Sequence, residues 1–275
     1  VHTNRPDRVL RHMLHRGQVF NVFVHNMDLE AQERTESIRE DKDAAKATSA
    51  PTAPTKRLGF VAVAAGSGQA DILRSLGVDV IVSGGQTMNP STADILSAIE
   101  EAGAENVIVL PDNSNIRMAA EAAVAAEDVR AAIVPTKTVL QAFSAMFAAD
   151  TEADLEANVD AMTEAISEIR DGEVTTAVRD SVAVDGTPIH AGDVMGIMGG
   201  AIRVVGSDVE QVTLDVIARM QDEGEGDTLT ILAGADMDDR SFRHLLDAIG
   251  RTQPDLELDP HRGEQPLYPV IFSIE

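Results

Sequence analysis

A regular alternation of short apolar runs and helical patterns begins at Gly59 and continues to about residue 147. The first run, GFVAVAA, is continuously apolar, which is typical of a strand that is buried on both faces. Helical patterns and further apolar runs then follow one another across short connections. Because consecutive parallel strands need a crossover helix to join them, this order predicts a parallel sheet with right-handed crossovers.

The pattern changes after residue 150. Residues 151–171 predict a helix with a single apolar stripe, and the stretches beyond it alternate with a period of two. Asp185-Gly186 and Gly199-Gly200 break these stretches, and both pairs are turn signals. We therefore predict a second lobe of the α+β class, with antiparallel strands and helices on one face.

The chain before the alternating region has a different composition. Residues 1–28 predict the end of a strand, a helix and a strand, which is too little to close a core. Residues 29–57 are charged and then rich in Ala, Pro and Thr, so burial cannot offset the entropy lost on ordering. We expect the end of a preceding domain at 1–28, a flexible linker at 29–57, a parallel α/β lobe at 58–150 and an α+β lobe at 151–275. We also expect the chain to be the downstream part of a longer protein.

Composition excludes several classes of function. The formal net charge of −24 opposes binding to nucleic acids and anionic membranes. The absence of cysteine rules out disulfides, thiolate zinc clusters and cysteine nucleophiles in this chain. No apolar run approaches the ~20 residues that a membrane span needs. We therefore expect a cytoplasmic protein with no nucleic-acid partner and no membrane insertion.

Small polar residues follow each of the four strands predicted in the first lobe, in AGSGQ, SGGQTMNPST (residues 83–92), PDNSN and PTK. The carboxyl ends of parallel strands share one edge of a sheet, where ligands bind in open α/β folds. Glycine backbone amides and the start of the next helix both favour negative charge. These loops predict an anion or carboxylate site. Its candidate residues are Ser67, Ser83, Gly84, Gly85, Gln86, Thr87, Asn89, Ser91, Thr92, Thr136 and Lys137.

A purely structural interpretation of the same loops stays open. Asn89-Pro90-Ser91 is an ordinary helix start, with Ser91 as the cap and Asp94 at the matching position of a capping box. AGSGQ is neither a Walker motif nor a complete dinucleotide fingerprint. No hydrolase or metalloprotease motif is present, so the sequence predicts no catalytic residue.

Several segments resemble a known family: VHTNRP, VAVAAGSG, SGGQTMNPST, VLPDNSNI, VPTKT, AVRDS and GEQPLYPVIFSIE occur in this order. Together they resemble the C-terminal portion of the large subunit of bacterial fatty acid kinases, dihydroxyacetone-kinase-like proteins that are also labelled DAK-phosphatase type. The resemblance implies a DegV-like two-lobed fold: a parallel-sheet lobe followed by an α+β lobe, after a fragment of a middle domain. It places the loop at 83–92 where acyl-binding relatives hold the lipid carboxylate, although this loop is longer and contains Met88.

The resemblance also implies a function. ATP and Mg²⁺ would bind an N-terminal kinase domain upstream of Val1, and a zinc site would lie in the middle domain. Of the zinc ligands this chain holds only His2, so that site is incomplete and no cofactor is expected here. The implied role is a non-catalytic regulatory and docking region of an ATP-dependent kinase. That kinase phosphorylates fatty acids presented by a DegV-type acyl-binding partner, for phospholipid synthesis.

Two alternatives stay open: a DegV-like module that binds a fatty acid or a small anion, and a dihydroxyacetone-kinase-type phosphotransferase or phosphatase. A homodimer is a further expectation from the family.

Overall fold

The computed structural model describes residues 56–84, 89–125, 130–224 and 226–275. All of them belong to one compact unit, Ala53–Glu275. The expectations for residues 1–55, including the domain fragment and the incomplete zinc site at His2, lie outside the described residues. Strand β1 (Lys56–Ala64) begins at Lys56 rather than at the expected boundary of residue 58.

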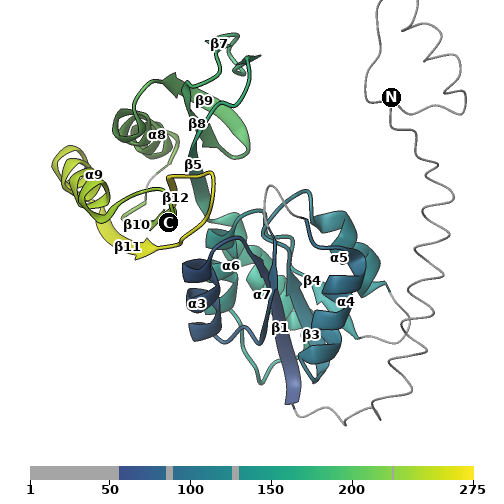
Figure 1. Cartoon of the computed structure of the whole chain (residues 1–275). Helices are drawn as coiled ribbons and strands as arrows, with labels where there is room; N and C mark the ends of the chain where they lie inside the picture. Colours follow the sequence, from purple (N-terminus) through teal and green to yellow (C-terminus); the bar gives the residue numbers. More distant parts are fainter. Residues whose placement is uncertain (1–55, 85–88, 126–129, 225) are drawn as a thin grey trace, which may run out of the picture. The chain divides into compact units, whose positions relative to one another are not determined.

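The first lobe is built on a parallel sheet with the strand order β2-β1-β3-β4 (Figure 1). The parallel pairing predicted from the sequence is confirmed in β1–β2, β1–β3 and β3–β4. The elements after β1 are α3 (Ser67–Ser75), β2 (Val80–Ser83), α4 (Thr92–Glu101), β3 (Ala104–Leu110), α5 (Arg117–Val124), β4 (Ala131–Ile133), α6 (Val139–Phe147) and α7 (Leu155–Ser167).

Helices cover both faces of this sheet, which explains the continuous apolar run of β1. Phe60 and Ala62 pack into a core that α3, α6 and α7 share, whereas Val61 and Val63 pack against α4 and α5. All four side chains are buried. A strand with both faces covered has no solvent side on which polar residues would alternate.

Helix α7 differs in extent from the predicted helix at 151–171. It starts after the N-cap Asp154, whose carboxylate accepts from the Ala157 amide, and it ends at Ser167. Arg170 and Asp171 already belong to the next strand, because the chain there pairs with the last strand of the protein. Met162 of α7 packs in the core of the first lobe, although it lies beyond the boundary expected at residue 150.

The second lobe is built on a mixed sheet with the order β11-β10-β12-β5-β8-β9 (Figure 1). Strands β6 and β7 form a separate two-stranded sheet. Its elements are β5 (Arg170–Thr176), β6 (Ser181–Val182), β7 (Pro188–Ile189), β8 (Val194–Met198), β9 (Ala201–Gly206), α8 (Val209–Glu223), β10 (Thr228–Ala233), α9 (Asp239–Thr252), β11 (Glu257–Arg262) and β12 (Val270–Ile274).

Two connections show which turn and strand predictions hold in this lobe. Gly199 and Gly200 join β8 to β9 and have φ angles of 54° and 79°. Tight hairpin turns of this kind require positive φ at both positions, so the predicted turn is confirmed. The antiparallel pairing expected in this lobe is present from β10 through β12, β5 and β8 to β9, whereas β11 pairs with β10 in parallel. Helix α9 lies between these two strands in the chain and supplies the crossover that parallel pairing needs.

The two faces of the second sheet have different neighbours. Val270 and Phe272 of β12 pack with α8 and α9, whereas Ile271 joins the core built around α3, α6 and α7. Leu232 of β10 also joins that core. The layer of α3, α6 and α7 therefore contacts both sheets. Among the described residues, no helix has the length and apolar character to cross a membrane.

Candidate functional site

A cavity of about 70 Å³ lies at the carboxyl edge of the first sheet, where the second lobe contacts it. The loops after β1, β2 and β3 reach it from one side, and β5 and residues 265–268 reach it from the other. Its lining residues are Val63, Ala65, Gln69, Gly84, Pro111, Asp112, Asn113, Ile116, Thr138, Val139, Glu173, Gln265, Pro266, Leu267, Tyr268 and Ile271.

The site residues predicted from the sequence divide into three groups. Gly84 lines the cavity, and the buried Thr136 accepts a hydrogen bond from the Asp112 amide at 3.1 Å beside it. Ser67, Ser83, Asn89 and Lys137 are exposed, while Ser91 and Thr92 are half-buried at the start of α4. Gly85, Gln86 and Thr87 lie outside the described residues.

Ser91 forms the predicted helix cap. Its hydroxyl accepts from the Asp94 amide at 3.2 Å, and the Asp94 carboxylate accepts from the Ser91 amide at 2.8 Å, which completes the capping box. The hydrogen bonds from the Ser91 hydroxyl and then from its amide lower the pKa of Asp94. The start of α4 therefore already holds a carboxylate of its own, and a ligand anion would have to displace it.

The glycines of AGSGQ allow a close contact between the lobes. A side chain at Gly68 would place its Cβ 1.8 Å from the carbonyl oxygen of Arg262. The Gln69 amide donates to the carbonyl of Gly263 at 3.1 Å across the same contact. Ser67 points to solvent at this loop, so the prediction that AGSGQ forms part of an anion site has no support from its geometry.

Two buried glutamines connect the lobes beside this contact, and the sequence did not single them out. Gln69 donates through Nε2 to Oε1 of Gln265 at 3.4 Å, and its own Oε1 accepts from the Ala65 amide at 3.1 Å. Gln265 donates through Nε2 to the carbonyls of Leu232 and Tyr268. The hydrogen bonds of both amides are satisfied inside the protein, as buried polar groups require.

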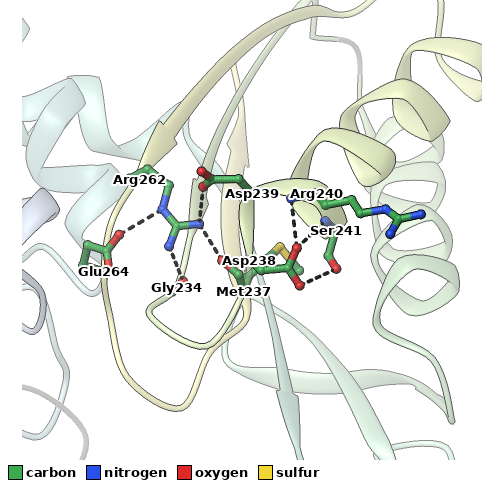
Figure 2. A network of polar contacts seen from close by, with 8 residues as sticks. All are labelled: Gly234, Met237, Asp238, Asp239, Arg240, Ser241, Arg262 and Glu264. Atoms are coloured by element: carbon green, nitrogen blue, oxygen red, sulfur yellow. Dashed lines mark hydrogen bonds and ion pairs between the residues drawn. The ribbon is translucent and has the colours of Figure 1, made fainter.

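Arg262 fixes the start of the loop that carries Gln265 (Figure 2). Its guanidinium donates to the carbonyls of Gly234 and Met237 and pairs with Glu264 and Asp239. These contacts join the end of β11 to the segment between β10 and α9, as Figure 2 shows. Arg262 therefore positions the wall of the cavity without lining it.

Two carboxyl groups line the cavity in surroundings that disfavour their charge. Burial raises the pKa of Asp112 well above its ordinary value, and the nearby Thr136 hydroxyl opposes this only in part. Burial, with a contribution from the charge of Asp171, raises the pKa of Glu173 to about 7. Burial beside Glu173 also raises the pKa of Tyr268 to about 12. The cavity wall therefore holds two carboxyl groups whose charged forms are unfavourable, and its described lining residues include no lysine, arginine or histidine.

Strained backbone occurs at the same place. Of the described residues other than glycine, only Asp112, Glu264 and Leu267 have positive φ, at 54°, 55° and 69°. Asp112 and Leu267 line the cavity, and Glu264 precedes its lining residue Gln265. Such residues cost energy and are concentrated at functional sites. The strain therefore marks the two loops as the candidate site.

Comparisons with known proteins agree with this architecture. The family of FakA-like C-terminal regions, named after a fatty acid kinase subunit, matches residues 59–275. The chain belongs to this family. Protein YloV of Bacillus subtilis (strain 168) is 36% identical over 277 residues, which cover all of this chain and 48% of YloV. An uncharacterized protein of Staphylococcus aureus (strain NCTC 8325 / PS 47) is 34% identical over 277 residues, again with 48% of its length covered. The chain thus spans about half the length of these curated relatives.

Solved structures of DegV proteins share the fold. The DegV family protein Cg2579 of Corynebacterium glutamicum superposes with a TM-score of 0.57 over 80% of this chain and 98% of its own, at 13% identity. The fatty acid kinase B3 protein of Streptococcus pneumoniae, loaded with linoleic acid, superposes with a TM-score of 0.57 at 15% identity. The superposition covers 80% of this chain and 99% of the kinase B3 protein. The predicted DegV-like two-lobed fold is confirmed, whereas likeness at this identity does not transfer a ligand.

Among the described residues, no three His, Asp or Glu side chains are grouped so that they could hold a metal ion. The zinc ligand implied by the family, His2, is not among them. Whether the chain takes a cofactor stays a prediction.

Proposed function

We propose that this chain is the non-catalytic docking region of a cytoplasmic fatty acid kinase, and that its partner is a DegV-type acyl-binding protein. Membership of the C-terminal family supports the association with a fatty acid kinase. The ATP-dependent step, which gives an acyl phosphate, would belong to sequence that the relatives carry outside the matched half.

The size of the sheet-edge cavity carries this proposal. Pockets that enclose small molecules usually measure roughly 300–1,000 Å³, whereas this cavity measures about 70 Å³. A fatty-acid carboxylate there would lie beside Asp112 and Glu173, whose own ionised forms burial already disfavours, and none of the described lining residues is a lysine, arginine or histidine that could balance its charge. A chain with the fold of fatty-acid-binding proteins, but with a small acidic cavity, is better suited to recognise a partner than to hold the lipid itself.

The exposed rim of the cavity would provide the docking surface. Small polar groups and one ammonium are exposed to solvent at the start of α3, at the end of β2 and on two loops of the first lobe. The residues are Ser67, Ser83, Asn89 and Lys137. Protein–protein interfaces commonly have a polar, solvent-accessible rim around a more apolar centre. Lys137 would contribute most to partner choice, since it carries positive charge on a strongly acidic chain.

Isothermal titration of this chain with a purified DegV-type protein from the same genome tests the proposal. Saturable binding is expected, together with a loss of affinity in Lys137→Ala. Arg251→Ala, at the exposed end of α9, is the matched control and should bind normally. Absence of binding to any such protein, or formation of acyl phosphate from ATP and fatty acid by this chain alone, would refute the docking role.

The fatty-acid-binding alternative has one observation in its favour. A cavity of about 380 Å³ lies between α3, α6 and the second sheet, with apolar walls that include Leu76, Phe143 and Ile169. This volume is within the range of small-molecule pockets. Native mass spectrometry of the purified chain separates the two functions: a co-purified fatty acid supports the binding module, and an unliganded mass supports docking.

A further inference from the structure

A row of polar side chains crosses the face of the second sheet that meets α3 and α6. Thr230 of β10 pairs with Ser273 of β12 on one side and with Asp259 of β11 on the other. Residues directly opposite one another in a sheet share a face, so these three side chains point the same way. Leu232 and Ile271 lie two positions further along β10 and β12, and both join the core built around α3, α6 and α7. The polar row therefore faces the helices.

Ser273 carries a hydroxyl that the protein leaves unused. The residue is only 3% exposed, yet its side chain forms no hydrogen bond with any residue that the structure describes. It lines the cavity of about 380 Å³ between this sheet and the two helices, together with its neighbour Thr230. Because buried polar groups are normally paired, a free hydroxyl on a cavity wall indicates that a bound molecule supplies the partner.

The opposite wall of the same cavity is apolar. Leu76 at the end of α3 and Leu140 and Phe143 of α6 line it. Phe147, at the last position of α6, lines it as well and is 77% exposed, so the apolar surface continues to solvent. Water can satisfy the hydroxyls of the sheet wall but gains nothing from this apolar wall. An amphipathic molecule matches both walls.

The remaining polar residues of the lining indicate the charge of that molecule. Asp259 and Glu275 are exposed, Asp259 lies 2.8 Å from Nε2 of His261, and no lysine or arginine occurs among the described lining residues. A carboxylate head would therefore find no lysine or arginine to balance it. An ammonium head would have to leave water for two neutral hydroxyls, which is costly for a charge. Serine and threonine hydroxyls both donate and accept, which suits a neutral head.

We propose that this cavity binds a neutral amphipathic molecule, with a hydroxyl head at Ser273 and Thr230 and an apolar body against α3 and α6. The absence of charge distinguishes this ligand from the fatty acid of the alternative function. The exposed residues proposed for docking do not line this cavity, so the two proposals stand independently.

Titration of the ¹⁵N-labelled full chain at pH 7.5 with 1-octanol, sodium octanoate and octylammonium chloride tests this site. The three probes share one alkyl chain and differ in the charge of the head. Octanol should give saturable shifts of the Ser273 and Thr230 amides, and both charged probes should bind about tenfold more weakly or not at all. Ser273→Ala should weaken octanol binding by roughly two- to tenfold, since one neutral hydrogen bond is lost. Its melting temperature should be unchanged, because the hydroxyl has no partner in the free protein.

The matched control is Ser181→Ala, which removes an exposed hydroxyl on β6 and should leave the affinity for octanol unchanged. If Ser273→Ala does not fold, Thr230→Val decides the test with the same expected loss of affinity. The proposal is overturned if octanol gives no saturable shift, or if octanoate or octylammonium binds as tightly as octanol. Unchanged octanol affinity in both cavity variants would overturn it as well.

Discussion

Replacing Glu173 by glutamine removes a carboxyl group whose ionised form is unfavourable in the folded protein. Burial and the neighbouring Asp171 raise the pKa of Glu173 from 4.5 to about 7. Between these values the folded protein binds a proton that the unfolded chain does not, so stability falls as pH rises. Above pH 7 the full pKa difference lowers the free energy of unfolding by about 3 kcal/mol, at 1.36 kcal/mol for each pKa unit.

Glu173→Gln should therefore raise the free energy of unfolding by roughly 1–3 kcal/mol at pH 8. At pH 4 the free energy of unfolding should change little. The lower end of the range allows for an amide that finds no hydrogen-bond partner. Urea unfolding followed by circular dichroism at several pH values measures this difference as a shift in the midpoint. Glu101→Gln, at an exposed site on α4, is the control and should show no such pH-dependent gain. Equal effects of Glu173→Gln at pH 4 and pH 8 would refute the assignment of a buried, charge-disfavoured carboxyl.

Three further substitutions test the packing around the site. Gly68→Ala should destabilise the protein by about 1–3 kcal/mol or more in thermal unfolding, because the new Cβ would lie 1.8 Å from the rigid Arg262 carbonyl. Unchanged stability of this variant would contradict the contact. Ser91→Ala should lower the free energy of unfolding by about 1 kcal/mol, because the N-cap of α4 is lost, and should leave the affinity for the partner unchanged. A loss of affinity without a loss of stability would instead favour a binding role for Ser91. Phe272→Ala should lower the free energy of unfolding in urea by about 3–5 kcal/mol, since this fully buried ring fills the core under α8 and α9. A decrease below about 1 kcal/mol would contradict this packing.

Local patterns predicted the first lobe well because each of them has a direct physical cause. The continuous run through Phe60 and Val63 predicted a strand covered on both faces, and helices do cover both faces. The spacing of Ser91 and Asp94 predicted a capping box that the structure contains. Such features depend on residues within a few positions of one another, so the sequence alone is sufficient for them.

The contacts across the lobes could not be predicted in the same way. Gln69 and Gln265 are far apart in the sequence, and a lone glutamine carries no periodic signal of burial. The parallel pairing of β11 also depends on where β12 inserts, which periodicity does not report. The strained Asp112 lay within the PDNSN loop, yet nothing in that loop distinguishes a buried carboxylate from an exposed one. Burial of polar residues is decided by tertiary packing rather than by local propensity.

The way in which the two lobes are joined bears on the choice between docking and lipid binding. Admission of an acyl chain at the sheet edge would require the lobes to separate there. The Gln69 amide would then lose its bond to Gly263, and the buried pair of Gln69 and Gln265 would be exposed. Leu232 and Ile271 would also leave the core that they share with α3, α6 and α7. Since each of these changes costs free energy and the described cavity wall offers a carboxylate no lysine, arginine or histidine, the closed edge favours a surface that recognises a partner over a tunnel that holds a lipid.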